Sequence, residues 1–321
     1  MEFVLGHVSD VPSVEDGYVL ATFSVSARGE GLFLFAETER ASDLHPRENT
    51  NFASFARSKL EQNVRYKLVK LCGHARMDID LGIHMTSFPM VDVFPDGRVL
   101  LVGPRCSWRG PDDYDHNGSV ILPGEFQSHN FLLGDGISGC MIDTRGQIWV
   151  SYFDEGIFGN NGWGNPGPRP VGQPGLACFD DSGNILWTFE DSGSMGRIDD
   201  VYALNVAGDN AFFYFYSDFL LGRANRQQEV KFYQPQLSGC KWFAINNQQA
   251  VFSGAYGDPV HQAFRLPRDK DGTLGKSEKI LLKLPDCQLP SNSTIFARDD
   301  SIHFCNEVGW YRLGLDEIEA N

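Results

Sequence analysis

The sequence predicts an all-β fold made of repeated four-stranded sheets, and three observations support this prediction. The chain of 321 residues is rich in phenylalanine and glycine, with 24 and 34 copies. Its apolar stretches are short and are separated by polar turns that contain Gly, Asn or Asp. Similar hairpins also recur along the chain at irregular intervals. Together these features indicate a single six-bladed β-propeller domain over residues 1–321.

The clearest hairpin occupies residues 139–152, GCMIDTRGQIWVSY, with its turn around Gly146. Five similar hairpins are expected, and their turns are centred on Gly17, Gly97, Gly208, Gln248 and Asp300. Each is expected to form the apolar inner half of a blade and to be followed by a more polar outer hairpin. In the first blade, residues 31–37 are expected to pair with residues 66–73.

The last blade lacks an outer strand, because only one strand and a few residues follow its first hairpin. The N-terminal segment MEFVLGHV is apolar and strand-like. We therefore expect this segment to complete the last blade and close the ring, which removes a free sheet edge.

Two insertions interrupt the repeats. Residues 38–64 are polar and contain SFARSKLEQ (54–62), which predicts a short helix on the rim. Residues 158–174 are dense in Gly and Pro and must form a loop, since these residues cannot continue a strand. Trp163 lies in this loop and is interpreted either as a platform for a ligand or as a side chain that pins the loop to the body.

The net charge of −15 arises from 27 basic and 42 acidic residues. This charge argues against nucleic-acid binding, and it suits a cation, a basic partner or simply solubility. The seven cysteines are scattered without a CxxC pair, which predicts reduced thiols and a cytoplasmic location. Neither a signal sequence nor a membrane-spanning segment is expected, so no membrane partner is expected either.

In a propeller, the loops that follow each second strand open on the same face as the loops that precede each first strand. Acidic residues recur in these loops, three times two residues after a tyrosine. The predicted ligand-binding residues are Asp135, Asp154, Glu155, Asp200, Asp218, Asp258, Glu307 and Trp163. Polar residues Asn292 and Ser293 precede the first strand of the last blade. The alternative is that each repeated Asp ties its own loop as an Asx-turn.

Gathered carboxylates need a cation, an arginine or raised pKa values to coexist. A channel metal site formed by Asp199, Asp200 and Asp154 is therefore one prediction, and oxygen ligands favour Ca²⁺ or Mg²⁺. Asp199 and His84 are the candidate catalytic residues, with His84 as a base that faces the channel. The alternative for His84 is a hydrogen-bonded core residue.

A second candidate metal site begins at Asp113. Residues Asp113, Asp115 and Asn117 match the start of a calcium-binding loop, DxDxNG. The expected acidic ligand at the twelfth position is instead Gly124. Asn117 and Gly118 are equally typical of a hairpin turn.

Residues 134–156, GDGISGCMIDTRGQIWVSYFDEG, resemble one unit of the NHL-type six-bladed propellers. This resemblance implies a fold and no activity. The same superfamily contains the gluconolactonase and regucalcin-like enzymes, which hold a divalent metal with a Glu, an Asn and an Asp. In this sequence the stretch that should supply the Glu is Val-Pro-Ser-Val (11–14), and the resemblance implies Asp199, Asp200 and Asn205 as substitutes for the other ligands.

Two functions follow as hypotheses. The first is a non-catalytic binding protein that uses an acidic, aromatic-lined face to hold a basic protein or a small cationic ligand. The alternative is a metal-dependent hydrolase of the lactonase type, with a divalent cation in the channel.

Overall fold

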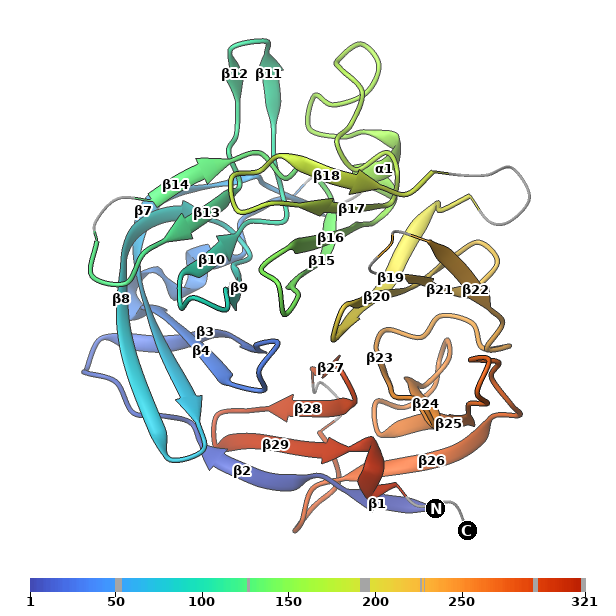
Figure 1. Ribbon diagram of the computed structural model, residues 1–321. Coiled ribbons are helices and arrows are strands. Elements are labelled where there is room, and N and C mark those ends of the chain that lie inside the picture. The colour runs from blue at the N-terminus through green and yellow to red at the C-terminus, as the bar shows by residue number, and fades with distance from the viewer. Residues whose placement is uncertain are drawn as a thin grey trace. The chain divides into compact units, whose positions relative to one another are not determined.

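The structure, a computed structural model, describes residues 1–49, 54–125, 128–190, 197–225, 227, 229–290 and 294–318. Within these residues the chain forms six mainly antiparallel sheets of four or five strands and two separate two-stranded hairpins, and the fold class is the predicted six-bladed β-propeller (Figure 1). The chain divides into a first unit, Ser13–Asp191, and a second unit, Met1–Pro12 with Ser192–Asn321. The units are described separately, and a single domain over residues 1–321 stays a prediction.

Three four-stranded sheets form the body of the first unit in the described residues. The first sheet contains β3 (Tyr18–Val25), β4 (Gly31–Glu37), β7 (Lys59–Cys72) and β8 (Ala75–Thr86). The second contains β9 (Met90–Val93), β10 (Val99–Val102), β13 (Gly118–Ile121) and β14 (Ser128–Phe131). The third contains β15 (Ile137–Ile142), β16 (Ile148–Tyr152), β17 (Leu176–Phe179) and β18 (Ile185–Thr188). Because β9 contacts both β3 and β15, the first strands of the three sheets lie together.

The predicted hairpins at Gly97 and Gly146 are confirmed by the pairs β9–β10 and β15–β16. The first predicted hairpin is displaced. Gly17 precedes β3, and the turn between the first two strands lies at Gly29, where the Gly29 N–H donates to the carbonyl of Ser26. The run GLFLFAE is therefore the second strand of its blade, and its pairing with residues 66–71 is confirmed.

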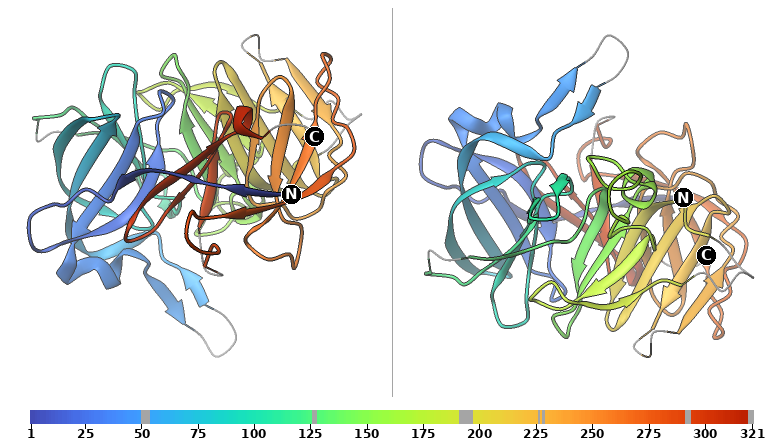
Figure 2. Two further views of the ribbon diagram at one scale, coloured as in Figure 1. Left: turned by 90° about the horizontal axis from the view of Figure 1, so that it is seen from below. Right: turned by 90° about the horizontal axis from the view of Figure 1, so that it is seen from above.

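The insertion after β4 contains no α-helix among its described residues. It consists of the 3-10 helix η1 (Thr38–Leu44) and a hairpin of β5 (Arg47–Asn49) and β6 (Ser54–Ala56), and β7 already begins at Lys59. The helix predicted over residues 54–62 is therefore wrong. The β5–β6 hairpin, light blue in Figure 2, projects away from the sheet of β3, β4, β7 and β8.

The Gly- and Pro-rich segment follows the short helix α1 (Asp154–Phe158) and forms a loop without strands, as predicted. It packs against a second projecting hairpin, β11 (Trp108–Gly110) and β12 (Asp113–Tyr114) (Figure 1). A Cβ atom at Gly162, where φ is +89°, would lie 1.9 Å from the carbonyl oxygen of Trp108. Only glycine allows this close approach.

The second unit also contains three sheets. The first contains β19 (Asp200–Ala207), β20 (Asn210–Tyr216), β21 (Leu220–Ala224) and β22 (Val230–Tyr233). The next contains β23 (Phe243–Ile245), β24 (Gln249–Ser253), β25 (Gln262–Pro267) and β26 (Glu278–Lys283), extended by β1 (Glu2–Val4). The last contains β27 (Ile295–Arg298), β28 (Ser301–Cys305), β29 (Gly309–Gly314) and β2 (Gly6–Asp10), and the 3-10 helix η2 (Leu315–Glu317) follows it. The hairpins predicted at Gly208, Gln248 and Asp300 are confirmed.

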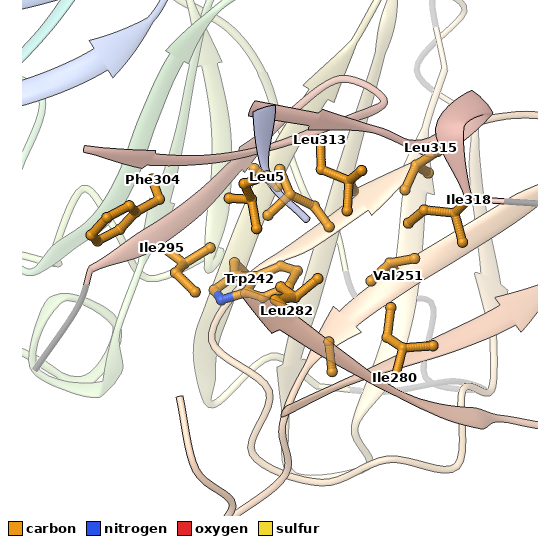
Figure 3. Close-up of a cluster of buried hydrophobic side chains, with 14 of the residues drawn as sticks. Leu5, Trp242, Val251, Ile280, Leu282, Ile295, Phe304, Leu313, Leu315 and Ile318 are labelled. Carbon is orange, nitrogen blue, oxygen red and sulfur yellow. The ribbon is translucent and has the colours of Figure 1, made fainter. Parts of the chain in front are cut away.

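The N-terminal segment completes the last blade, as predicted, because β2 pairs antiparallel with β29. It also does more, since β1 pairs in parallel with β26 of the preceding sheet. Leu5 lies between these two strands and is fully buried. Figure 3 shows Leu5 among apolar side chains of both sheets, including Leu282, Leu313 and Trp242.

Candidate functional site

Loops of the first unit surround a cavity of about 540 Å³. The cavity is lined by residues from the loops that follow β4, β10 and β16, and by residues at the start of β9 and β15. We call it the Arg105 cavity. Its lining residues are Arg47, Ser54, Ala56, Phe88, Met90, Pro104, Arg105, Ile137, Phe153, Glu155, Asn160 and Asn161.

Arg105 is the charged centre of this cavity, and its side chain is only 8% exposed. Its Nη1 lies 2.6 Å from Oε2 of Glu155, and its Nη2 donates to Oδ2 of Asp135 at 3.2 Å. Its Nε lies 3.1 Å from Oδ1 of Asp135. The guanidinium also lies 5.3 Å from the centroid of the Phe153 ring. One arginine thus neutralises two of the acids that the sequence places on this face.

Asp135 is buried and connects three segments of the chain. Its carboxylate accepts the Cys106 N–H at 2.8 Å and both of its oxygens accept from Nδ2 of Asn161. Burial raises the pKa of Asp135, while the charge of Arg105 and these donors act in the opposite direction. Asp135 therefore holds the segments of the cavity wall together.

Glu155 is the acid that reaches the cavity itself, with a side chain that is 37% exposed. Its Oε2 also accepts from Nδ2 of Asn160 at 2.7 Å. The neighbouring Asp154 is exposed and its Oδ1 accepts the N–H of Glu155 within α1. Asp154 is not among the residues that line the cavity.

Trp163 is buried, and its indole N–H donates to the carbonyl of Cys106 at 2.9 Å. The ring therefore pins the Gly- and Pro-rich loop to the segment that carries Arg105. Of the two interpretations of Trp163, this geometry supports the structural one.

The calcium-loop residues have other partners in the structure. Asp113 pairs with Arg109 at 2.8 Å, and the buried Asp115 pairs with Arg109 at 2.9 Å and with Lys59 at 2.7 Å. Burial raises the pKa of Asp115, but hydrogen bonds from Arg109, Lys59 and Ser107 outweigh it and hold the pKa below its usual range. These cations occupy the carboxylate oxygens that a calcium ion would need.

Asn117 likewise serves the backbone. Its Nδ2 donates to the carbonyls of Gly103 and Gly134, and its Oδ1 accepts the N–H of Leu133. The geometry therefore does not support a calcium loop at Asp113, Asp115 and Asn117.

His84 lies on β8, the outermost strand of its sheet. This position differs from the predicted one, in which His84 faces the channel near the first strands. Its Nε2 lies 2.7 Å from the carbonyl oxygen of Leu81, and burial lowers its pKa. It lines a smaller polar cavity of about 300 Å³ together with Lys59 and Asp115. The role of a channel base does not fit this position.

The acids predicted in the second unit have varied surroundings. Oδ1 of Asp199 lies 2.8 Å from Nε of Arg197, and Oδ2 of Asp258 accepts the N–H of Ala255 in its own loop. Asp200 opens β19, opposite Tyr216 on β20, while Asp218 and Glu307 are exposed. Asn292 and Ser293 lie outside the described residues.

The described residues contain no group of three or more His, Cys, Asp or Glu side chains that could hold a metal ion. Asn205, which the resemblance implied as a ligand, is buried and is used structurally. Its Nδ2 donates to the carbonyls of Phe243 and Asp299, and its Oδ1 accepts the N–H of Asp299.

Sequence reasoning missed Arg105, Asn160 and Asn161 as members of one site, although Arg105 was visible between the acids of neighbouring repeats. It expected an aromatic-lined face but did not predict which rings would meet. In the structure, Tyr216 and Tyr256 belong to a ring cluster with Tyr202 and Phe219 in the second unit.

In the part of the chain that the structure describes, no helix is both long and apolar enough to span a membrane. No protein-family model matches the chain, and no curated protein matches it.

Solved structures with a similar backbone include propellers of different kinds. Virginiamycin B lyase from Staphylococcus aureus is 11% identical, with a TM-score of 0.47 over 90% of this chain and 92% of that one. YCF48 bound to D1 peptide is 8% identical, with a TM-score of 0.45 over 95% and 98%. The β-propeller domain of Cps50 (Swd1) from Myceliophteria thermophila is 8% identical, with a TM-score of 0.43 over 96% and 99%. At this level of similarity they carry no argument about activity or ligand.

Proposed function

We propose that the protein is a non-catalytic binding protein and that the Arg105 cavity is its ligand site. The observation that carries the proposal is the cavity itself. Its volume of about 540 Å³ falls within the usual range for small-molecule sites. Phe88, Met90, Ile137 and Phe153 offer an apolar wall, and a few polar groups are placed among them.

The polar groups of the cavity are held in position before any ligand arrives. Arg105 is fixed by Asp135 and Glu155, and Asn160 and Asn161 are fixed by the same two carboxylates. A site that is ordered in advance loses less side-chain entropy on binding, which favours affinity. The ion pairs therefore support a binding role even though they use up much of the charge of the acids.

The charge pattern favours a ligand with an apolar body and a carboxylate or carbonyl group. Arg105 balances Asp135 and Glu155, so the acids expected to attract a cation are neutralised here. Arg47 is exposed beside the ring of Phe88, and no carboxylate of a described residue forms an ion pair with it. Arg47 is thus the charge left for a ligand, either a small organic acid or the end of a peptide.

A binding role also fits the described lining, which contains one hydroxyl group, Ser54, and neither histidine nor cysteine. Nucleophilic catalysis by Ser or Cys needs an adjacent base. We propose no hydrolase activity, because His84 lies on an outermost strand and the described residues contain no cluster able to hold a metal.

The test is isothermal titration calorimetry with phenylacetate and with the corresponding alcohol and amine. We expect the acid to bind most tightly, and Arg47→Ala to weaken it roughly tenfold, as loss of one charge-assisted hydrogen bond implies. Phe153→Ala should also weaken it, whereas Arg40→Ala, an exchange on η1 outside the cavity, should have no effect. Equal affinity for acid and amine, unchanged in Arg47→Ala and Phe153→Ala, would contradict the proposal.

A further inference from the structure

Four aromatic side chains of the second unit form a cluster at the ends of its strands. Tyr202 belongs to β19, Tyr216 ends β20, Phe219 lies in the turn before β21, and Tyr256 follows β24. Every ring contacts at least two others, with centroid distances from 5.6 to 6.4 Å. We call these four residues the aromatic cluster.

The aromatic cluster remains accessible to solvent, unlike the phenylalanines of the sheet interiors. Tyr256 is 58% exposed and Tyr216 is 44% exposed. Large aromatic side chains that stay exposed together are typical of interaction surfaces, because burial on binding is favourable. The cluster therefore has free ring area to offer a partner.

The orientation of the rings is fixed by their surroundings. The hydroxyl groups of Tyr202 and Tyr256 are hydrogen-bonded to each other. A Cβ atom at Gly239, where φ is +82°, would lie 2.5 Å from the Tyr256 ring, so this ring lies directly on the backbone of Gly239. Burial, together with the hydrogen bond between its hydroxyl and that of Tyr256, raises the pKa of Tyr202. The cluster is an ordered platform rather than a set of independent side chains.

A cation already lies on this platform. Nζ of Lys241 is 4.3 Å from the centroid of the Tyr202 ring, which is a cation–π contact. Lys241 is exposed and comes from the segment before β23, so its side chain is free to move away. Tyr202 thus has an electron-rich face that attracts a positive charge.

The charges in the same loops favour a positively charged partner. Asp199, Asp200, Asp218 and Asp258 flank the tyrosines in the sequence, against Arg197 and Lys241. Asp200 is opposite Tyr216 in the sheet. Its charge contributes to the raised pKa of Tyr202, which indicates that the side chains of Asp200 and Tyr202 are near each other. Excess negative charge beside a cation–π platform complements an arginine or lysine and repels an acidic segment.

We propose that the aromatic cluster is a docking surface for an arginine or lysine side chain of a partner protein. Lys241 occupies this place when the partner is absent and is displaced when it binds. The proposal is independent of the Arg105 cavity, which lies in the other unit and favours a carboxylate.

The probe is a fluorescent peptide of alternating Gly and Arg, with a Gly and Glu peptide as its counterpart, and binding is followed by anisotropy. We expect the arginine peptide alone to bind. Tyr256→Ala removes the most exposed ring of the aromatic cluster and should weaken it roughly fivefold, about the size of one cation–π contact. Tyr256→Phe keeps the ring and should retain most of the affinity. Tyr114→Ala, which removes an exposed tyrosine of the first unit, is the matched control and should have no effect.

Lys241→Ala gives the sharpest test, because it should strengthen binding of the arginine peptide. The exchange removes both a competing occupant and a like charge. A purely structural cluster would show no such gain. Weaker binding in Lys241→Ala, or preferred binding of the glutamate peptide, would overturn the proposal.

Two other results would also overturn it. Binding that is the same in Tyr256→Ala and Tyr114→Ala would indicate a general attraction to the net charge of −15. Self-association in sedimentation velocity that disappears in Tyr256→Ala would assign the cluster to a contact between copies of this chain. Neither result would affect the proposal for the Arg105 cavity, since its probe and its variants are different.

Discussion

Asp135 and Glu155 coexist in one loop cluster because Arg105 lies between them. The sequence shows the acids and the arginine, but the acids lie 30 and 50 positions after Arg105 and belong to the next repeat. Hydrophobic patterns determine where strands begin and end, and they carry no information on how irregular loops meet. The sequence therefore predicted that Asp135 and Glu155 lie in loops on the same face, but it did not predict the cation that neutralises them.

We predict that Arg105→Ala strongly destabilises the protein. The exchange leaves the buried carboxylate of Asp135 without its cation, which typically costs about 3–5 kcal/mol. Urea unfolding should show this loss. Adding Asp135→Asn should recover part of it, because the remaining amide carries no charge. A loss below about 1 kcal/mol would instead place Arg105 among weak surface pairs.

His303 on β28 should make stability depend on pH. Burial lowers its pKa to about 3, with Arg312 and Arg298 acting in the same direction, and its Nδ1 accepts the indole N–H of Trp310. In the unfolded chain a histidine has a pKa of about 6.5. Between these values the unfolded state binds an extra proton, so this contribution to stability is complete above about pH 6.5 and falls as the pH decreases.

We expect this residue to lower the free energy of unfolding by about 2 kcal/mol between pH 7 and pH 5. His303→Gln keeps an acceptor for Trp310 but does not titrate. Urea unfolding of both proteins at several pH values isolates the effect, since carboxylate titrations are common to both. Parallel pH profiles would contradict the assignment.

At the scale of elements, strand patterns predicted most hairpins, and the two errors have identifiable causes. Residues 54–62 are mostly polar, and their buried Leu60 is followed four residues later by buried Val64, a spacing that does not distinguish a helix from a strand. In the structure the register of β7 against β8 shifts between Lys59 and Val64, so this part of the strand is irregular. Gly17 gave a valid turn signal, but a turn signal does not tell which two strands it connects.

The N-terminal segment is expected to be essential for the second unit. Deleting residues 1–8 removes β1 and most of β2 and exposes the edges of β26 and β29. We predict a sharp decrease in the melting temperature by calorimetry. Leu5→Ala alone should cost about 2–5 kcal/mol, because the side chain is fully buried between two sheets. Val8→Ala, at an exposed position of β2, is the control, and an unchanged melting curve of the truncated chain would contradict the pairing.

At the scale of the whole molecule, the net charge of −15 suggested a bound cation, and the structure offers another account. Asp113 is paired with Arg109, and Asp115 is paired with Lys59. The carboxylate of Asp135 is paired with Arg105. Local pairing of this kind balances the charge of these particular carboxylates. Composition reports total charge only, and it could not predict which acids would be paired.

We therefore predict that metal removal has no effect on stability. Dialysis against EDTA should leave the melting temperature unchanged, and subsequent Ca²⁺ or Mg²⁺ should not raise it. The physical reason is that Asp113, Asp115 and Asp199 already have cationic partners, and the described residues contain no cluster of three ligands. A lower melting temperature in EDTA that Ca²⁺ restores would show that a metal site exists.

The pairing of β2 with β29 also has a consequence for the order of synthesis. β2 is synthesised well before its partner β29, which emerges about 300 residues later. At roughly 5–20 residues per second, the interval is roughly 15–60 s. During this time the nascent chain carries unpaired strand edges and the unburied Leu5, which are available to chaperones or to neighbouring chains on the same polysome. Ribosomes that stall before Gly309 would release a second unit that cannot finish its last sheet.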